Sequence, residues 1–170
     1  MSTLKVDTIQ DAAGAFEHAR LIQILSTSTG AVSTTTTVIP EDDTIPQNDE
    51  GAELLTITIT PKHADNKLFI HGIAQMKPST GRNMGLAIFH ASTANALATN
   101  WSDDQGTQTS QVVLTHVMSA GTTSATTFKL RAGKESAHAM ALNGTITTGS
   151  PGRRLGGVSS SRMVVFEYVP

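Results

Sequence analysis

Residues 33–61, "STTTTVIPEDDTIPQNDEGAELLTITITP", decide the fold class of this chain. From Leu55 to Thr60, apolar and threonine side chains alternate strictly, and Pro61 then ends the pattern. This alternation has the period of a β-strand with one buried face, and proline removes a donor that a strand ladder needs. Threonine is β-branched and fits a half-exposed sheet surface. The segment therefore predicts a β-strand that begins after Gly51 and ends at Pro61.

The threonine run at the start of this stretch predicts a strand with an exposed face. The four threonines at 34–37 cannot all face a core, so a strand over 32–39 must present at least one side to solvent or to a partner. Pro40 ends that strand because it has no backbone donor. Residues 41–51 then predict an irregular, solvated crossover with Ile45 as its only apolar anchor.

Short apolar runs separated by turn signals continue on both sides of this stretch. Residues 92–110 are the longest polar excursion between them and are predicted to form a loop. Many short strands with turn signals about every 8 to 12 residues are typical of an all-β, antiparallel β-sandwich or jelly-roll domain. The further expected strands are residues 21–26, 68–76, 84–91, 111–120, 126–133, 137–144 and 162–170.

Composition narrows the function classes. The chain has 170 residues, a formal net charge of -2 and no cysteine. This charge gives no electrostatic footprint for nucleic acid, and the lack of cysteine excludes disulfides, thiolate metal sites and cysteine nucleophiles. No apolar run reaches the ~20 residues that span a bilayer, so we expect no membrane insertion. Aromatic residues are only 4% of the chain, so the core must be thin, and oligomerisation would bury more apolar area.

The first residues form a separate unit. Leu4 and Val6 alternate with polar residues, Ile9 follows, and a turn-like "DAAG" comes next, which predicts one extended strand that pairs with another surface. A helix through residues 11–25 is the alternative interpretation. The expected units are an N-terminal attachment arm, residues 1–19, and a β-domain, residues 20–170.

Catalytic and metal chemistry find little support. His71, His90 and His116 each lie on an expected strand without a ligand-spacing motif, so we expect no metal site within one chain. In a homotrimer, one such histidine would be repeated about the axis and could bind an ion. The acidic residues of 41–50 lack the EF-hand pattern and indicate a solvated segment. No nucleophile elbow or phosphate-binding loop is present, so we expect no enzyme activity, no catalytic residue and no cofactor.

Trp101 is the most suggestive residue for recognition. It is the only tryptophan of the chain and stands in "NWSDDQG", beside Asp103 and Asp104. An aromatic face flanked by carboxylates is suited to stack on a sugar ring and accept hydrogen bonds from its hydroxyl groups. The alternative is that this ring closes one end of the sandwich or an intersubunit groove. These three residues are the candidate receptor contact, with a host cell-surface glycan as the expected ligand.

Several segments together resemble a family of tailed-bacteriophage fibre proteins that is abundant among marine phages. The resemblance follows the family's order and covers nearly the whole chain. The segments are "LKVDTIQDAAG" (4–14), "TTTTVIPEDDTIPQNDEGAELLTITITPKHADNKLFI" (34–70), "AIFHASTANALAT" (87–99), "TSATTFKLRAG" (123–133), "LNG" (142–144) and "RRLGGVSSSRMVVFEY" (153–168).

The resemblance implies a homotrimeric β-sandwich or jelly-roll domain that is not an enzyme. It also implies that "LKVDTIQ" ties the protein to the virion, with Leu4, Val6 and Ile9 as attachment residues and other tail or baseplate proteins as partners of residues 1–16. The family often places a long shaft between this arm and the β-domain. Here the two are nearly contiguous, which implies a short fibre.

These observations give one leading function and three alternatives. The leading hypothesis is a bacteriophage virion structural protein, a short trimeric tail fibre that contacts the host surface. The second is a capsid decoration or head-fibre protein of the same fold. A polysaccharide depolymerase and a stand-alone carbohydrate-binding module are the other two.

Overall fold

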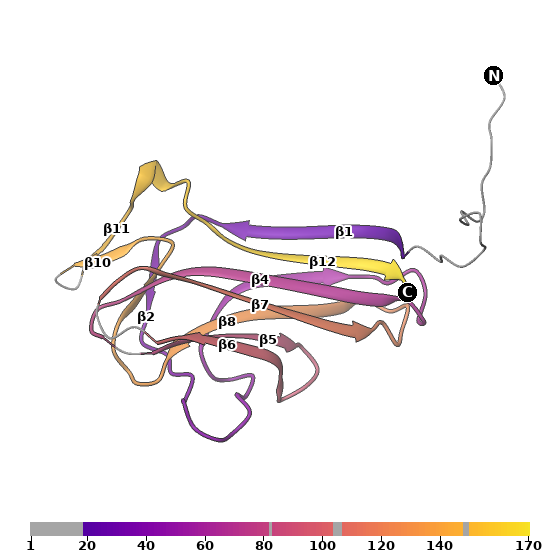
Figure 1. The fold of residues 1–170 in the computed structure, drawn as a ribbon, viewed down its shortest axis with the longest axis horizontal. Helices are drawn as coiled ribbons and strands as arrows, with labels where there is room; N and C mark the ends of the chain where they lie inside the picture. The colour runs from indigo at the N-terminus through magenta and orange to yellow at the C-terminus, as the bar shows by residue number, and fades with distance from the viewer. Residues whose placement is uncertain (1–18, 82, 104–106, 148–149) are drawn as a thin grey trace, which may run out of the picture.

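The computed structural model describes residues 19–81, 83–103, 107–147 and 150–170 (Figure 1). Within these residues the fold is all-β with antiparallel sheets, as the sequence predicts. The only helical element there is one 3-10 turn, Leu155–Gly157. The strands are β1 (Arg20–Thr29), β2 (Ser33–Thr35), β3 (Ala52–Ile59), β4 (Lys67–Pro78), β5 (Met84–His90), β6 (Ala96–Ser102), β7 (Ser110–Ser119), β8 (Thr126–Lys134), β9 (Met140–Leu142), β10 (Thr145–Thr147), β11 (Ser150–Gly152) and β12 (Ser161–Val169).

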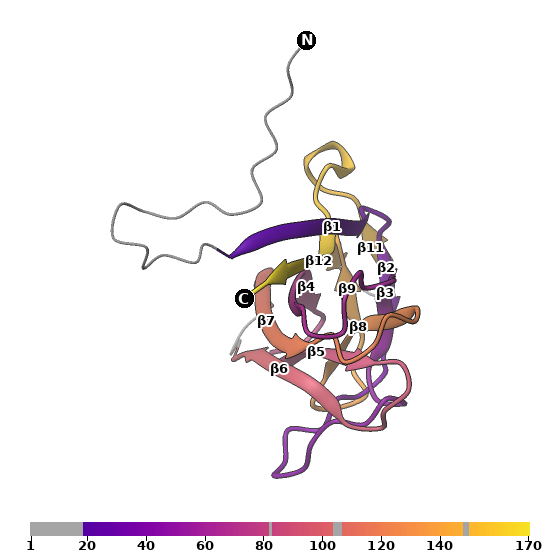
Figure 2. The ribbon, with the colours of Figure 1, turned by 90° about the vertical axis from the view of Figure 1, so that its right-hand side faces the viewer.

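Two antiparallel sheets pack face to face (Figures 1 and 2). The first has six strands: β1, β12, β4, β9 and β2 follow one another, and β7 also pairs with β4. β7 pairs with β4 along Lys67–Met76, while β9 pairs with its last residues, Met76–Pro78. The second sheet has the order β3, β8, β5, β6. β10 and β11 form a separate hairpin.

The core lies between the two sheets because each strand turns alternate side chains inward. In β4, every second residue from Leu68 to Pro78 is buried. In β3, the alternation that the sequence shows puts the isoleucines inward and the threonines outward. The largest fully buried core side chains are Phe128, Ile59, Leu68, Ile70, Met76, Met84, Leu86, Ile88, Leu130 and Met140.

Single polar contacts tie the two sheets together at their sides. On one side, the Gln23 side chain in β1 donates to the carbonyl of Thr60, just after β3, at 2.9 Å. On the other side, the Asn100 side chain in β6 donates to the carbonyl of Val113 in β7 at 2.7 Å. The Asn100 contact holds β6 beside β7, which matters for the site described below.

Three sequence-based expectations about strands are wrong. The strand expected over 32–39 is limited to Ser33–Thr35, because β9 offers only three partners and the chain then leaves the sheet toward β8. Residues 96–102, expected in a loop, form β6 because their backbone pairs with β5 despite their polar side chains. β4 continues through Pro78, at its last position, where proline is tolerated.

Other expectations hold or lie outside the described residues. Thr34, Thr36 and Thr37 are exposed, so the threonine run does present a face to solvent. The predicted attachment residues Leu4, Val6 and Ile9 lie outside the described residues, as do residues 1–16 as a whole. In the described part of the chain, no helix is long and apolar enough to cross a membrane.

A buried carboxylate joins β12 to the turn before β4. The side chain of Glu167 has no exposed surface. It accepts hydrogen bonds from the Lys62 backbone at 2.7 Å and the Asn66 side chain at 2.5 Å, and a further bond from Gln23 at 2.5 Å. Desolvation raises the pKa of Glu167, but the hydrogen bonds together outweigh it and hold the pKa below its ordinary value.

We predict that Glu167→Gln lowers the free energy of unfolding by about 2–3 kcal/mol at pH 7, because one acceptor oxygen is replaced by a donor among buried donors. A carboxylate with a lowered pKa in the folded chain stabilises it fully above the ordinary pKa of about 4.3, and this contribution is lost as the pH falls through the lowered pKa. Urea unfolding at pH 7 and pH 3.5 should therefore show a smaller loss on acidification in the variant. Equal losses in both proteins would contradict this role.

Candidate functional site

Residues 36–51, which include the expected crossover 41–51, form a third layer on the outer face of the four-stranded sheet. We call residues 36–51 the crossover from here on. Val38 makes a parallel bridge with Lys134 at the end of β8, and the Ile39 backbone donates to the carbonyl of Lys134 at 2.9 Å. The Ile39 side chain is buried against Ala87 and Phe89 on the outward side of β5. Ile39 is therefore the apolar anchor of this segment, and the expectation that Ile45 anchors it is wrong because Ile45 is 54% exposed.

The anchor depends on two glycines that lie opposite each other in β8 and β5. A Cβ atom at Gly133 would stand 2.7 Å from the backbone nitrogen of Ile39. At Gly85, its partner in the ladder, a Cβ atom would be 3.3 Å from a methyl carbon of the same isoleucine. Side chains at these positions would push the crossover away from the sheet, so glycine permits the close approach.

Trp101 in β6 lies next to these two glycines in the same row across the sheet. It faces Gly85 across the ladder between β5 and β6, so no side chain crowds the indole from that side. Its backbone N–H donates to the Asn100 side-chain oxygen at 2.9 Å, and the nitrogen of the same amide donates to the carbonyl of Val113 in β7. The indole is 62% exposed although its backbone is fixed in a strand. The sequence predicts that Trp101 lies in a loop, whereas the structure places it in β6.

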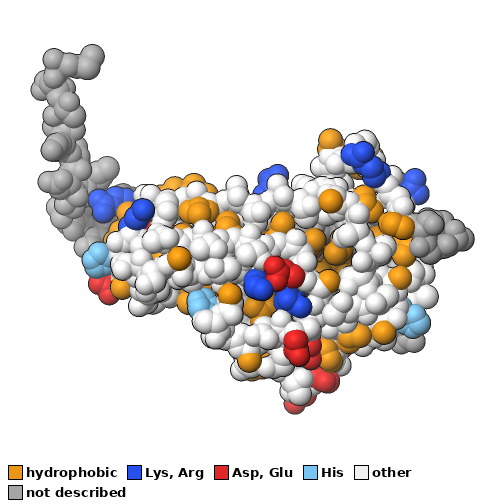
Figure 3. Space-filling view, turned by 180° about the vertical axis from the view of Figure 1, so that it is seen from behind, with side chains coloured by type: hydrophobic (Ala, Val, Ile, Leu, Met, Phe, Trp, Pro, Cys, Tyr) orange, Lys and Arg blue, Asp and Glu red, His pale blue; other side chains and the backbone are white. Residues whose placement is uncertain are grey.

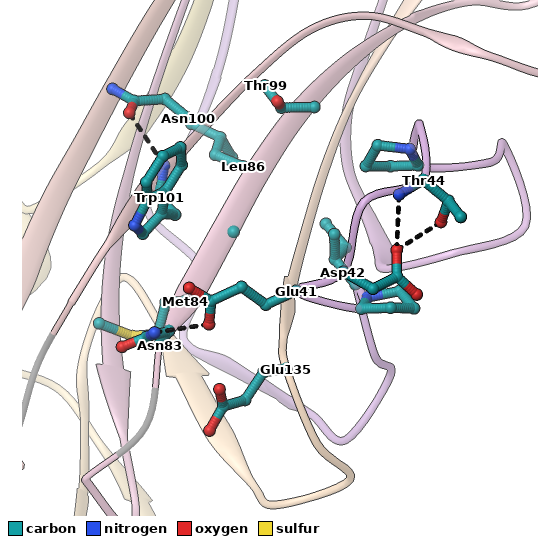
Figure 4. Close-up of a pocket in the computed structure, with 14 residues that line it drawn as sticks. Glu41, Asp42, Thr44, Asn83, Met84, Leu86, Thr99, Asn100, Trp101 and Glu135 are labelled. Atoms are coloured by element: carbon teal, nitrogen blue, oxygen red, sulfur yellow. Dashed lines mark hydrogen bonds between the residues drawn. The ribbon is translucent and has the colours of Figure 1, made fainter.

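A cleft of about 330 Å³ lies between the crossover and strands β5 and β6 (Figure 4). Trp101 and Asn100 border it on one side, the residues after Ile39 border it on the other, and Met84, Gly85 and Leu86 line it from β5. The remaining lining residues are Ile39, Pro40, Glu41, Asp42, Thr44, Pro46, Asn83, Thr99 and Glu135. The cleft thus combines an exposed aromatic ring with acidic and amide side chains.

The carboxylates of the cleft are held in place by neighbouring groups. Glu41 accepts a hydrogen bond from the Asn83 side chain at 2.5 Å (Figure 4). Asp42 accepts from the hydroxyl of Thr44 at 2.5 Å and from its backbone at 2.9 Å, and these two bonds lower the pKa of Asp42. In Figure 3, acidic side chains gather along the lower edge of the molecule, where Figure 1 places the crossover.

Only part of the predicted receptor contact comes together here. Trp101 lines the cleft, Asp103 does not, and Asp104 lies outside the described residues. The sequence missed Asn83 and Glu135, because they stand in separate turns and join Trp101 only when the strands pair. The backbone of Glu135 donates to the carbonyl of Asn83 at 3.3 Å, which brings these two turns together.

His71, His90 and His116 do not form a metal-binding cluster. Among the described residues, no group of three or more histidine or acidic side chains could hold a metal ion. His90 packs edge-on against Phe128 and bonds to the hydroxyl of Ser92 at 2.6 Å. His116 is partly buried, and desolvation lowers its pKa. His71 lies half-buried on the outer side of the six-stranded sheet.

That outer side carries an apolar surface. Ile24, Phe166, Phe69 and Val117 form one row across β1, β12, β4 and β7. The two phenylalanine rings meet edge to face with centroids 5.8 Å apart. Leu21 and Tyr168 pair with each other beside this row, toward the end of β12. Leu21, Ile24 and Val117 are each about half exposed. We call these six residues the outer apolar face.

Comparison with known proteins gives distant structural likenesses. The chain matches no protein-family model and no curated protein. It is similar to a sugar-binding protein, the EclA C-terminal domain, with a TM-score of 0.38 and 11% identity over 81% of this chain and 86% of that one. It is also similar to the VP2 subviral particle of infectious bursal disease virus, with a TM-score of 0.40 and 14% identity over 85% of this chain.

The Gx strain structure of the same virus gives a TM-score of 0.40 and 16% identity over 91% of this chain. The chain spans only 37% and 38% of the two viral chains. At these values the likenesses carry no argument about function. The proposals below therefore rest on the sequence, the cleft and the outer apolar face.

Proposed function

We propose that this protein is a structural component of a bacteriophage virion, a short homotrimeric tail fibre that contacts a host cell-surface glycan. The observation that carries the glycan contact is the exposed Trp101 in a cleft lined by Glu41 and Asn83. A sugar ring stacks its C–H face on an indole and gives its hydroxyl hydrogens to carboxylate or amide oxygens. The virion role is supported by the sequence resemblance, which covers nearly the whole chain.

The trimer is supported by the outer apolar face. The crossover covers part of the outer side of the four-stranded sheet, whereas Leu21, Ile24 and Val117 on the outer side of the six-stranded sheet are each about half exposed. The next row along it, Ser26, Val164, His71 and Thr115, adds no acidic residue, lysine or arginine. The middle of this side is therefore uncharged, and Lys67 and Arg162 lie in the flanking rows. Uncharged surfaces of the same kind can meet without repulsion, so further copies of this chain are the occupants we propose.

The cleft leads to the first prediction about function. Trp101→Ala should reduce glycan affinity at least tenfold, because stacking on an aromatic ring is lost. The measurement is binding of the purified protein to an immobilised glycan array, followed by titration of the best ligand. Ile45→Ala, which removes an exposed apolar side chain of the crossover outside the cleft, should bind as the unaltered protein does. Undiminished binding by the tryptophan variant would remove the cleft from the function.

The outer apolar face leads to a prediction about assembly. Purified protein should scatter light as a particle of about three times the 17.9 kDa chain mass. Val117→Asp should reduce this to one chain mass, because a carboxylate would be buried without a partner in each interface. Ile45→Asp places the same charge on a side chain of similar exposure elsewhere and should remain trimeric. A monomeric unaltered protein would contradict the proposed trimer.

The place of the protein in the particle is a separate prediction. We expect reconstruction of an intact phage to show density for the β-domain at the tail, three copies together, with residues 1–16 against a tail or baseplate protein. Density on the capsid shell instead would support a head fibre or decoration protein of the same fold. Loss of cell-surface glycan on incubation with purified protein would support a depolymerase.

A further inference from the structure

We infer that the cleft beside Trp101 takes a neutral or amino sugar at the end of a glycan and rejects acidic sugars. This inference rests on the proposed glycan contact and concerns the chemical class of its ligand. Three features of the cleft carry it: its charge, the direction of its hydrogen bonds and its size.

The charge of the cleft is negative among the lining residues. Glu41 and Asp42 contribute two carboxylates whose partners, the Asn83 amide and Thr44, are neutral, and the described lining contains no lysine or arginine. Asp42 is bonded to Thr44 and its pKa is lowered, so it stays ionised near neutral pH. A ligand carboxylate or sulfate would meet like charges at short range, whereas an ammonium group would meet opposite ones.

The hydrogen bonds of the cleft leave acceptors for the ligand. The Asn100 amide is engaged at both ends, by the Trp101 backbone and by β7. The Thr44 hydroxyl and the Asn83 amide both donate to carboxylates of the protein. The Trp101 indole N–H and the Thr99 hydroxyl can still donate, but the carboxylates favour a ligand that supplies donors. Sugar hydroxyl and ammonium groups do so, while carboxylate and sulfate groups are acceptors only.

The size and shape of the cleft favour a terminal unit. Its volume of about 330 Å³ is at the small end of the range for small-molecule sites. Trp101 stands beside a glycine, so a flat C–H face can lie on the indole without meeting another side chain of β5. A single sugar ring, or two linked rings, matches this surface better than an extended polysaccharide.

The test is titration of the purified full chain with four probes: lactose, glucosamine, sialyllactose and glucuronic acid. Quenching of Trp101 fluorescence reports binding, because this is the only tryptophan. We expect saturable binding of at least one of the first two and at least tenfold weaker binding of both acidic probes. Tighter binding of an acidic probe that still requires Trp101 would overturn this inference and leave the proposed glycan contact standing. No saturable binding of these probes or of any array glycan would overturn both.

Charge variants make the test sharper. Glu41→Gln keeps an acceptor for Asn83 but removes the charge, so glucosamine affinity should fall about tenfold while lactose affinity changes by less than about twofold. Asp43→Asn removes a charge from the same crossover outside the cleft lining and should leave both affinities unchanged. Arg82, next to Asn83 in the sequence, lies outside the described residues. If Arg82→Ala abolished binding of an acidic probe, arginine would be the recognising group and the inference would be wrong.

Discussion

The close approach of Ile39 to two facing glycines, by its backbone to Gly133 and by its side chain to Gly85, is the constraint on which the rest of the site depends. Gly133 and Gly85 lie side by side in β8 and β5, and only hydrogen atoms separate their backbones from the crossover above. With Ile39 held there by the carbonyl of Lys134, the acidic residues that follow Pro40 must pass in front of β5 and β6. The cleft is the space between this part of the crossover and Trp101.

The same constraint makes the two outer sides of the sandwich different. The side formed by the four-stranded sheet is covered by its own chain and presents polar groups and a cleft. The side formed by the six-stranded sheet keeps the row Ile24, Phe166, Phe69 and Val117 at its surface. The proposed short fibre would use the first side for the glycan and the second for contacts with copies of the chain.

Sequence and structure agree best where one period governs a segment. The alternation between Leu55 and Thr60 predicts β3 and its buried side correctly, because a strand turns every second side chain into the core. The prediction fails for β6, because its polar side chains are typical of a loop. It forms a strand because its backbone pairs with β5. The prediction fails again at the crossover, where hydrophobicity alone does not tell the buried Ile39 from the exposed Ile45.

The sequence by itself determined the all-β class and the solvated threonine run, because alternation and β-branching are local properties. Only the tertiary structure decided that Trp101 stands in a strand opposite Gly85, and that Glu41, Asn83 and Glu135 join it. These residues are far apart along the chain, and their meeting follows from strand register and from the two glycines that admit Ile39. Register and close backbone approach are relations between segments, which no single stretch of sequence contains.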